Sequence, residues 1–311
     1  MQVLVLGAAA GGGFPQWNCN CPNCYHARQG STDHQPRTQS SIALSVDGKQ
    51  WLLCNASPDI RAQLNANPEL CPERWPNKLR GSGVRGVLLV DAQIDHVTGL
   101  LSLREGCPLD VWCTPNVHRD LSTGFPLFPM LEHWGGLRWQ PIGLEGNQEV
   151  VEFSIPFLPD IAITAFALHS NAPPYSPRRG APSCGDNLGL YMVDRRSGKS
   201  LCYAPGLGNP TPLAMRFLNA ADVVMVDGTL WEDDEMQALG VGTSTGQQMG
   251  HLALNGIGGM CELLNALPSS TRRILIHINN TNPILDCASD AAKTLQAAGI
   301  ETAYDGMKLT L

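Results

Sequence analysis

Three cysteines near the start of the chain, Cys19, Cys21 and Cys24, lie within the six-residue run CNCPNC. Proline and asparagine favour tight turns, so the intervening residues can direct all three sulfurs to one side. Neighbouring thiolates repel one another unless a cation neutralises them, and Zn²⁺ is the usual ion in such clusters. The run therefore predicts a structural zinc site rather than free or redox-active thiols. The fourth ligand must come from elsewhere, either from His26 nearby or from the distant segment 277–280.

A second set of polar residues follows apolar runs that are typical of buried strands. Each of these residues alone is most simply explained as a hydrogen-bonded strand end. Together they place carboxylates and imidazoles at the ends of several strands, which is a pattern that can bind a metal. The residues are Asp91, Gln93, Asp95 and His96 after 84–90, then His169 after 161–168, Asp227 after 223–226, and His277 within 273–278.

The elements that must position these groups alternate between strands and helices along the whole chain. The apolar runs predict strands at 1–6, 41–46, 50–54, 84–90, 110–113, 161–168, 188–194, 200–204, 223–226, 273–278 and 301–310. Helices are expected at 58–65, after His96, and at 115–122, 211–219, 250–267 and 288–298. Asp47-Gly48 predicts a hairpin, and the glycines at 7–13 predict a loop that closely approaches other backbone. The alternation predicts one α/β domain over 1–311, with the zinc-binding loop at about 14–38.

The composition narrows the classes of function. The chain has 311 residues, 43% of them hydrophobic, and a formal net charge of -7, which argues against nucleic-acid or anionic-membrane partners. The N-terminal segment lacks a basic secretory start, and no apolar run is long enough to span a bilayer. The eleven cysteines are an odd number and eight of them are scattered, which fits a reducing compartment. We therefore expect a cytoplasmic protein that binds a small molecule or a peptide.

The run DAQIDH at 91–96 resembles the His-x-His-x-Asp-His signature of the metallo-β-lactamase superfamily. Asp95 and His96 match the signature, whereas Asp91 and Gln93 stand where the superfamily has histidines. His169, Asp227 and His277 then recur in the superfamily's order. The resemblance implies an α/β fold of the metallo-β-lactamase type, a four-layer αββα sandwich.

Carried over by position, the resemblance implies that the first metal site keeps only His169. The second site keeps Asp95, His96, Asp227 and His277, a set that suits one Fe²⁺, with Zn²⁺ or Mn²⁺ as alternatives. Ordinary two-metal hydrolysis is therefore disfavoured. Asp91 and Gln93, the first two positions of the signature, either orient the histidines or contact the substrate.

The run Gly250-His251-Leu252 is similar to the Gly-His-x-Thr element of the phosphodiesterase and tRNA-processing branch of the superfamily. The resemblance implies that His251 acts as a general acid, although packing at a helix start would explain it equally well. The same branch carries a cysteine zinc site whose fourth ligand is a histidine. Here Asn280 stands at that position, so Asn280, His26 or a water completes the zinc site.

The runs CNCPNC, DAQIDH, GAAAGGGFPQWNC and HINNTNPIL together resemble the coenzyme PQQ synthesis protein B family. Membership implies a role in making pyrroloquinoline quinone (PQQ) from a peptide whose glutamate and tyrosine are cross-linked. It implies a non-haem iron-dependent hydroxylase of the tyrosine ring, or else a carrier that helps PQQ or its precursor towards the periplasm. For a carrier, Arg178 and Arg179 could bind the acidic product. A phosphodiesterase-like hydrolase is the third hypothesis. The expected partner is the quinone precursor or PQQ, with a homodimer as a possible assembly.

Overall fold

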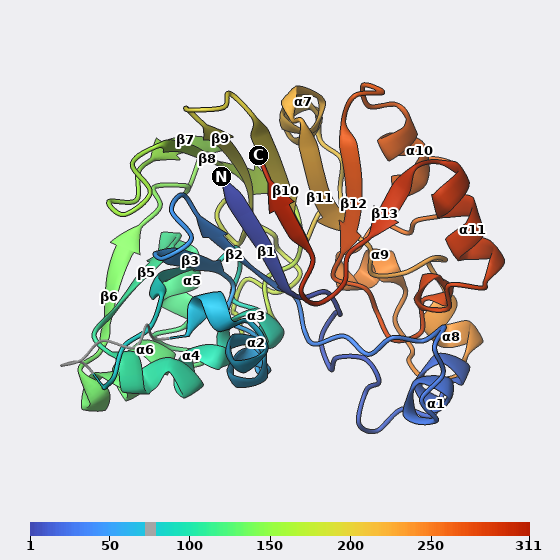
Figure 1. The fold of residues 1–311 in the computed structure, drawn as a ribbon, viewed down its shortest axis with the longest axis horizontal. Helices are drawn as coiled ribbons and strands as arrows, with labels where there is room; N and C mark the ends of the chain where they lie inside the picture. The colour runs from blue at the N-terminus through green and yellow to red at the C-terminus, as the bar shows by residue number, and fades with distance from the viewer. Residues whose placement is uncertain (72–78) are drawn as a thin grey trace.

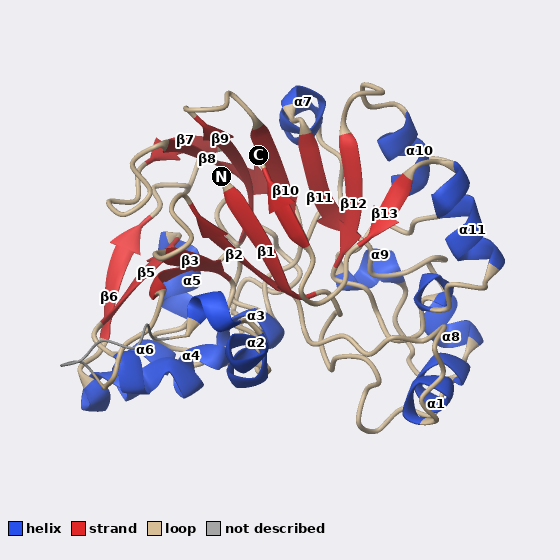
Figure 2. Ribbon diagram, in the orientation of Figure 1, coloured by secondary structure: helices blue, strands red, loops and turns tan. Residues whose placement is uncertain are grey.

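Two β-sheets lie face to face, and helices cover the outer face of each sheet (Figures 1 and 2). The computed structural model describes residues 1–71 and 79–311. The layers follow the order helix, sheet, sheet, helix, so the predicted αββα sandwich is confirmed. Within the described ranges, no helix has the length and apolar character that a membrane crossing would require.

The first sheet is seven-stranded, in the order β14-β1-β2-β3-β4-β5-β6. Its strands are β1 Gln2–Gly7, β2 Ser41–Ser45, β3 Trp51–Cys54, β4 Val84–Leu88, β5 Leu109–Cys113, β6 Leu137–Pro141 and β14 Lys308–Thr310. The second sheet is also seven-stranded, in the order β13-β12-β11-β10-β9-β8-β7. Its strands are β7 Val150–Phe153, β8 Ile161–Leu168, β9 Asn187–Asp194, β10 Ser200–Ala204, β11 Val223–Asp227, β12 Arg272–Ile276 and β13 Ile300–Thr302.

The helices of the described residues are short. They are α1 Pro22–Arg28, α2 Ile60–Ala66, α3 Ile94–Val97, α4 Gly99–Ser102, α5 Pro115–Asp120, α6 Leu127–Leu131, α7 Pro212–Ala220, α8 Glu235–Ala238, α9 Gly246–Met249, α10 Met260–Asn265 and α11 Asp290–Ala297. Apolar residues of α2, α4, α5 and α6 pack on the first sheet, and those of α7, α10 and α11 pack on the second.

Strand β1 shows how the sequence builds these layers. Val3 and Val5 join the apolar core between the two sheets, while Leu4 and Leu6 join the core under the helices. Because side chains alternate along a strand, a run that is apolar at every position must be buried on both faces. The continuous apolar runs in the sequence therefore predict a sheet with a covered face on each side.

The predicted hairpin and the predicted close approach of the glycine-rich loop to other backbone are both present. The hairpin at Asp47-Gly48 forms between β2 and β3, with Gly48 at φ 72° and the Asp47 carboxylate accepting the amide of Lys49 at 2.8 Å. In the glycine-rich loop, a Cβ at Gly7 would lie 2.2 Å from the Gln39 carbonyl oxygen. Only glycine fits such an approach.

The structure corrects three predicted elements. The expected helix at 250–267 forms only in its later part, as α10, because Gly250 ends α9 at φ 99° and the left-handed Gly256 and Gly258 keep the chain irregular until α10 begins. The expected final strand at 301–310 is instead two strands, β13 and β14, which belong to different sheets. The helix expected after His96 begins earlier, at Ile94, so His96 lies in its first turn.

Candidate functional site

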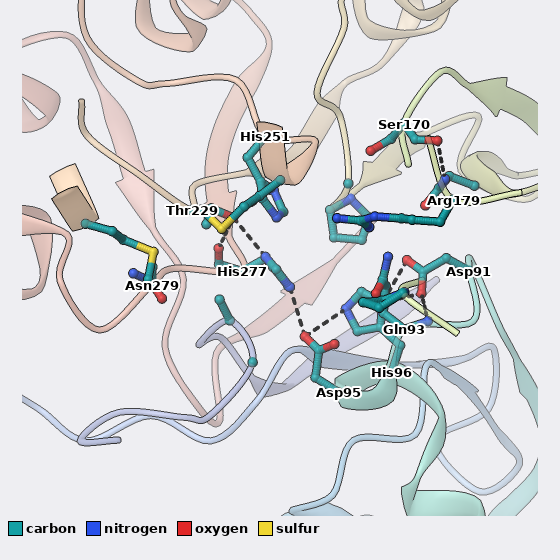
Figure 3. Close-up of a pocket in the computed structure, with 18 of the residues that line it drawn as sticks. Asp91, Gln93, Asp95, His96, Ser170, Arg179, Thr229, His251, His277 and Asn279 are labelled. Carbon is teal, nitrogen blue, oxygen red and sulfur yellow. Dashed lines mark hydrogen bonds and ion pairs between the residues drawn. The ribbon is translucent and has the colours of Figure 1, made fainter. Parts of the chain in front are cut away.

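Asp95, His96 and His277 form a compact group at the carboxyl ends of strands from both sheets, and we refer to them as the metal group. Asp95 and His96 lie in α3, and His277 follows β12. One ligand atom of each residue lies within 4.8 Å of those of the other two. The Asp95 Oδ2 atom is 3.2 Å from His277 Nε2 and 3.9 Å from His96 Nε2 (Figure 3). Two imidazoles and one carboxylate thus converge on one point.

The state of His96 indicates that this group fits a metal. Its Nε2 atom is buried and has no hydrogen-bond partner, although it points towards the Asp95 carboxylate. A buried polar atom without a partner is costly, and a cation that accepted its lone pair would remove that cost. The donor set of two histidines and one carboxylate suits Fe²⁺, and it also binds Zn²⁺ or Mn²⁺.

Asp91 contacts the Nδ1 atom of His96 and so fixes the orientation of its ring. Both Asp91 carboxylate oxygens contact His96 Nδ1, at 2.9 Å and 2.8 Å, and the aspartate is buried. Burial alone would lower the pKa of His96, but the negative charges of Asp91 and Asp95 raise it overall. A carboxylate on Nδ1 fixes the tautomer that leaves the Nε2 lone pair for a metal. Asp91 therefore acts through His96 in this arrangement.

Asp227 lies on the opposite side of the His277 ring from Asp95. His277 Nδ1 is 3.6 Å from Asp227 Oδ1 and 2.9 Å from the Thr229 hydroxyl. Asp227, His251 and His277 form a second compact group, which shares only His277 with the metal group. Because His277 Nδ1 faces Asp227 and Nε2 faces Asp95, one cation at Nε2 meets three of the four predicted residues.

The charges around His277 explain its protonation in the metal-free protein. Burial lowers the pKa of His277, but hydrogen bonds to Asp227 and Asp95 outweigh it and raise the pKa to about 10. Burial alone would raise the pKa of Asp95, but the charge of His96 and the hydrogen bond and charge of His277 hold it well below its usual range. An imidazolium sits between two carboxylates, and a metal ion would replace its proton.

His251 and Gln93 line the cavity above the metal group (Figure 3). The His251 Nδ1 atom is 2.9 Å from Asp227 Oδ2, and its ring stacks on His277 with the centroids 5.3 Å apart. His251 follows the end of α9 rather than opening a helix. The Gln93 side chain donates to the Asn171 carbonyl at 3.4 Å, so it belongs to the cavity wall.

The structure does not bring His169 to either group. Its side chain is 45% exposed, and its Nε2 atom is 3.4 Å from the Glu149 carboxylate on the surface. The chain turns outwards after the buried end of β8 at Leu168, so the imidazole faces the solvent. The structure therefore places His169 outside both groups.

The cysteine cluster, Cys19, Cys21 and Cys24, has all three sulfurs within 4.8 Å of one another. The terminal amide atom of Asn280 lies 3.1 Å, 3.6 Å and 3.4 Å from them, as a fourth vertex would. The assignment of oxygen and nitrogen within an amide follows from the hydrogen-bond network, and a bound zinc would require the oxygen at that vertex. His26 is exposed and contacts the His34 ring instead. The structure therefore favours Asn280 over His26.

The cavity beside the metal group has a volume of about 410 Å³ and is lined mostly by residues of the loops and short helices that follow strands of both sheets. Arg179 lines it, whereas Arg178 is held by two aspartates outside it. Thr229 and Asn187, which were not predicted from the sequence, also line the cavity. Thr229 follows Asp227 by two residues at the end of β11, so its place after a strand end was the available signal.

Comparison with known proteins gives a consistent result. Residues 50–278 match the family model described as a beta-lactamase superfamily domain. The chain is 59% identical to coenzyme PQQ synthesis protein B of Stutzerimonas stutzeri and 58% identical to that of Pseudomonas aeruginosa UCBPP-PA14, with 100% of each chain covered. Among solved structures, Zn²⁺-bound PqqB from Methylobacterium extorquens matches with a TM-score of 0.88 and 39% identity over 100% of both chains. A diphosphatase of the PhnP family shares the fold, with a TM-score of 0.66 and 15% identity over 99% of this chain and 96% of that one. The chain belongs to the coenzyme PQQ synthesis protein B family, within the β-lactamase superfamily.

Proposed function

We propose that this protein acts in PQQ biosynthesis as an Fe²⁺-dependent oxygenase that hydroxylates the tyrosine ring of a glutamate-tyrosine-derived intermediate. The observation that carries the proposal is the metal group: two imidazoles and one carboxylate beside a cavity, with His96 Nε2 buried and unpartnered. Two histidines and one carboxylate with open positions are the donor set of non-haem Fe²⁺ oxygenases.

The reaction converts a ring C–H bond into C–OH. Dioxygen supplies the inserted oxygen atom, the second oxygen leaves as water, and an external reductant such as ascorbate provides two electrons and two protons. Bound Fe²⁺ would supply the dioxygen chemistry. Asp95, His96 and His277 would hold the metal, and Asp91 would keep His96 in the binding tautomer.

His251 is the residue placed to move a proton. Asp227 engages its Nδ1 atom at 2.9 Å, which leaves Nε2 for a phenol in the cavity. The contact with Asp227 fixes the orientation of the ring, so the Nε2 atom of His251 can take a proton from a ligand and return it. Gln93 and Asn187 line the cavity with amide groups that can orient the polar atoms of a ligand.

The test is oxygen uptake by protein purified without oxygen and loaded with Fe²⁺, given a tyrosine-derived dipeptide and ascorbate. We expect uptake matched one to one by hydroxylated product. The His277→Ala variant should lose both iron binding and uptake, whereas His169→Ala should keep both because His169 lies outside the metal group. Stoichiometric Fe²⁺ binding without any uptake would refute the oxygenase.

A carrier of PQQ or its precursor is the second candidate, because the cavity of about 410 Å³ is large enough for a small ligand and one arginine lines it. Tight binding of PQQ without turnover of any precursor would favour this function. Phosphodiester hydrolysis is less favourable. A two-metal clamp needs the first site, where Asp91 is engaged with His96 and His169 faces the solvent.

A further inference from the structure

Two adjacent arginines in the loop after β8 have opposite environments. The Arg178 guanidinium forms ion pairs with Asp120 at 2.7 Å and with Asp186 at 2.6 Å, and both aspartates are 2% exposed. Arg178 is thus committed to a buried charge cluster. The structure places Arg178 outside the cavity, with its guanidinium paired to two carboxylates.

Arg179 lines the cavity and has no acidic partner. Its Nη1 atom donates to the Ala172 carbonyl at 2.8 Å, and across residues 1–71 and 79–311 no carboxylate pairs with it. A guanidinium has five N–H donors, so this single bond leaves most of them free. A free, planar array of donors on a cavity wall is suited to a carboxylate.

The loop holds Arg179 in place before any ligand arrives. The Arg179 amide donates to the Ser176 carbonyl at 3.1 Å, and the Ser176 hydroxyl donates to Asp120 at 3.0 Å. The buried ion pairs of Arg178 lie one residue away. The backbone at Arg179 is therefore fixed by the core, and its side chain is held by Ala172. Such preorganisation lowers the cost of binding a ligand.

We infer that Arg179 binds a carboxylate of the ligand in the cavity that the metal group also borders. In Figure 3, Arg179 and Ser170 lie across the cavity from Asp95. The cavity thus selects an aromatic acid whose carboxylate pairs with Arg179 while its ring oxygen faces the metal group. This inference rests on the proposed function for the ring's position, but the carboxylate subsite stands on the arginine.

The test is calorimetric titration of the Zn²⁺-loaded protein with PQQ and with the trimethyl ester of PQQ, in which the carboxylates are neutral. A hydrogen-bonded charge pair contributes enough that Arg179→Gln should weaken PQQ binding by about tenfold or more. Arg179→Lys should recover part of the loss, because it keeps the charge without the planar array. The ester should bind wild type and Arg179→Gln equally.

The matched control is Arg195→Gln. Arg195 is also exposed and also donates to one backbone carbonyl, that of Pro159 at 3.3 Å, but it does not line the cavity. It should leave PQQ binding unchanged. Equal PQQ affinity of the Arg179→Gln and Arg195→Gln variants, or no PQQ binding by wild type, would overturn the subsite. Neither result bears on oxygen uptake, so the oxygenase proposal is judged separately.

Discussion

Replacing Asp91 by asparagine tests whether the altered first position of the motif now serves the metal through His96. The substitution is nearly isosteric, so packing is preserved, but it removes the charge behind His96 Nδ1, where two carboxylate oxygens lie at 2.8 Å and 2.9 Å. Loss of such an outer partner typically weakens metal affinity by about 10- to 100-fold. That range corresponds to about 1.4 to 2.7 kcal/mol of binding free energy.

The assay is competition between the protein and a chelator for Co²⁺, which reports metal affinity without turnover. The matched control is Gln93→Ala, two residues away, whose side chain contacts the Asn171 carbonyl rather than a metal-binding histidine. We expect the control to keep wild-type affinity and Asp91→Asn to lose about 10- to 100-fold. Wild-type affinity in a folded Asp91→Asn protein would refute the reasoning, because His96 would then need no carboxylate.

Three further outcomes follow from the same geometry. The pKa of metal-free His277 is raised from 6.5 to about 10. Its proton therefore stabilises the metal-free fold fully below pH 6.5, and this stabilisation is lost as the pH rises to about 10. Because Co²⁺ must displace that proton, the Co²⁺ affinity should rise between pH 6.5 and about 10. Cys21→Ser should lower the zinc content, the melting temperature and the active-site Co²⁺ affinity, whereas Cys287→Ser, at an exposed position, should change none of them. Arg178→Met leaves two buried aspartates without their cation, and it should lower the free energy of unfolding, measured in urea, by about 3 to 5 kcal/mol.

The sequence predicts most of the sandwich because its strands are buried on both faces. Runs such as 223–226 and 161–168 are apolar enough to indicate strands without further context, and β11 and β8 lie there. Strands β6 and β7 were missed because their residues are half-buried or exposed at the sheet edges and lack that signal. Burial, rather than intrinsic propensity, made the successful predictions possible.

The site was predicted at the level of positions but not of side-chain directions. The order of Asp95, His96, Asp227 and His277 along the chain places all four at neighbouring strand ends. Whether one cation can reach them depends on the backbone at His277, which adopts a left-handed φ of 61° and turns the two ring nitrogens towards different partners. Spacing in a sequence carries no information on such a conformation.

One short segment, 277–280, contributes His277 to the metal group and Asn280 to the surroundings of the cysteine cluster. This segment links the predicted zinc site to the metal group. A left-handed, non-glycine residue such as His277 persists only where its surroundings determine the backbone. Three residues on, Asn280 contacts all three cysteine sulfurs, and its carbonyl accepts the Asn23 amide at 3.1 Å. The Asn282 amide then ties the segment to the Gly228 carbonyl at 2.9 Å, beside Asp227. Zinc bound by the cysteines would hold the segment at Asn280 and so constrain His277. Metal affinity at the active site should therefore depend on the cysteines, although none of them lines the cavity.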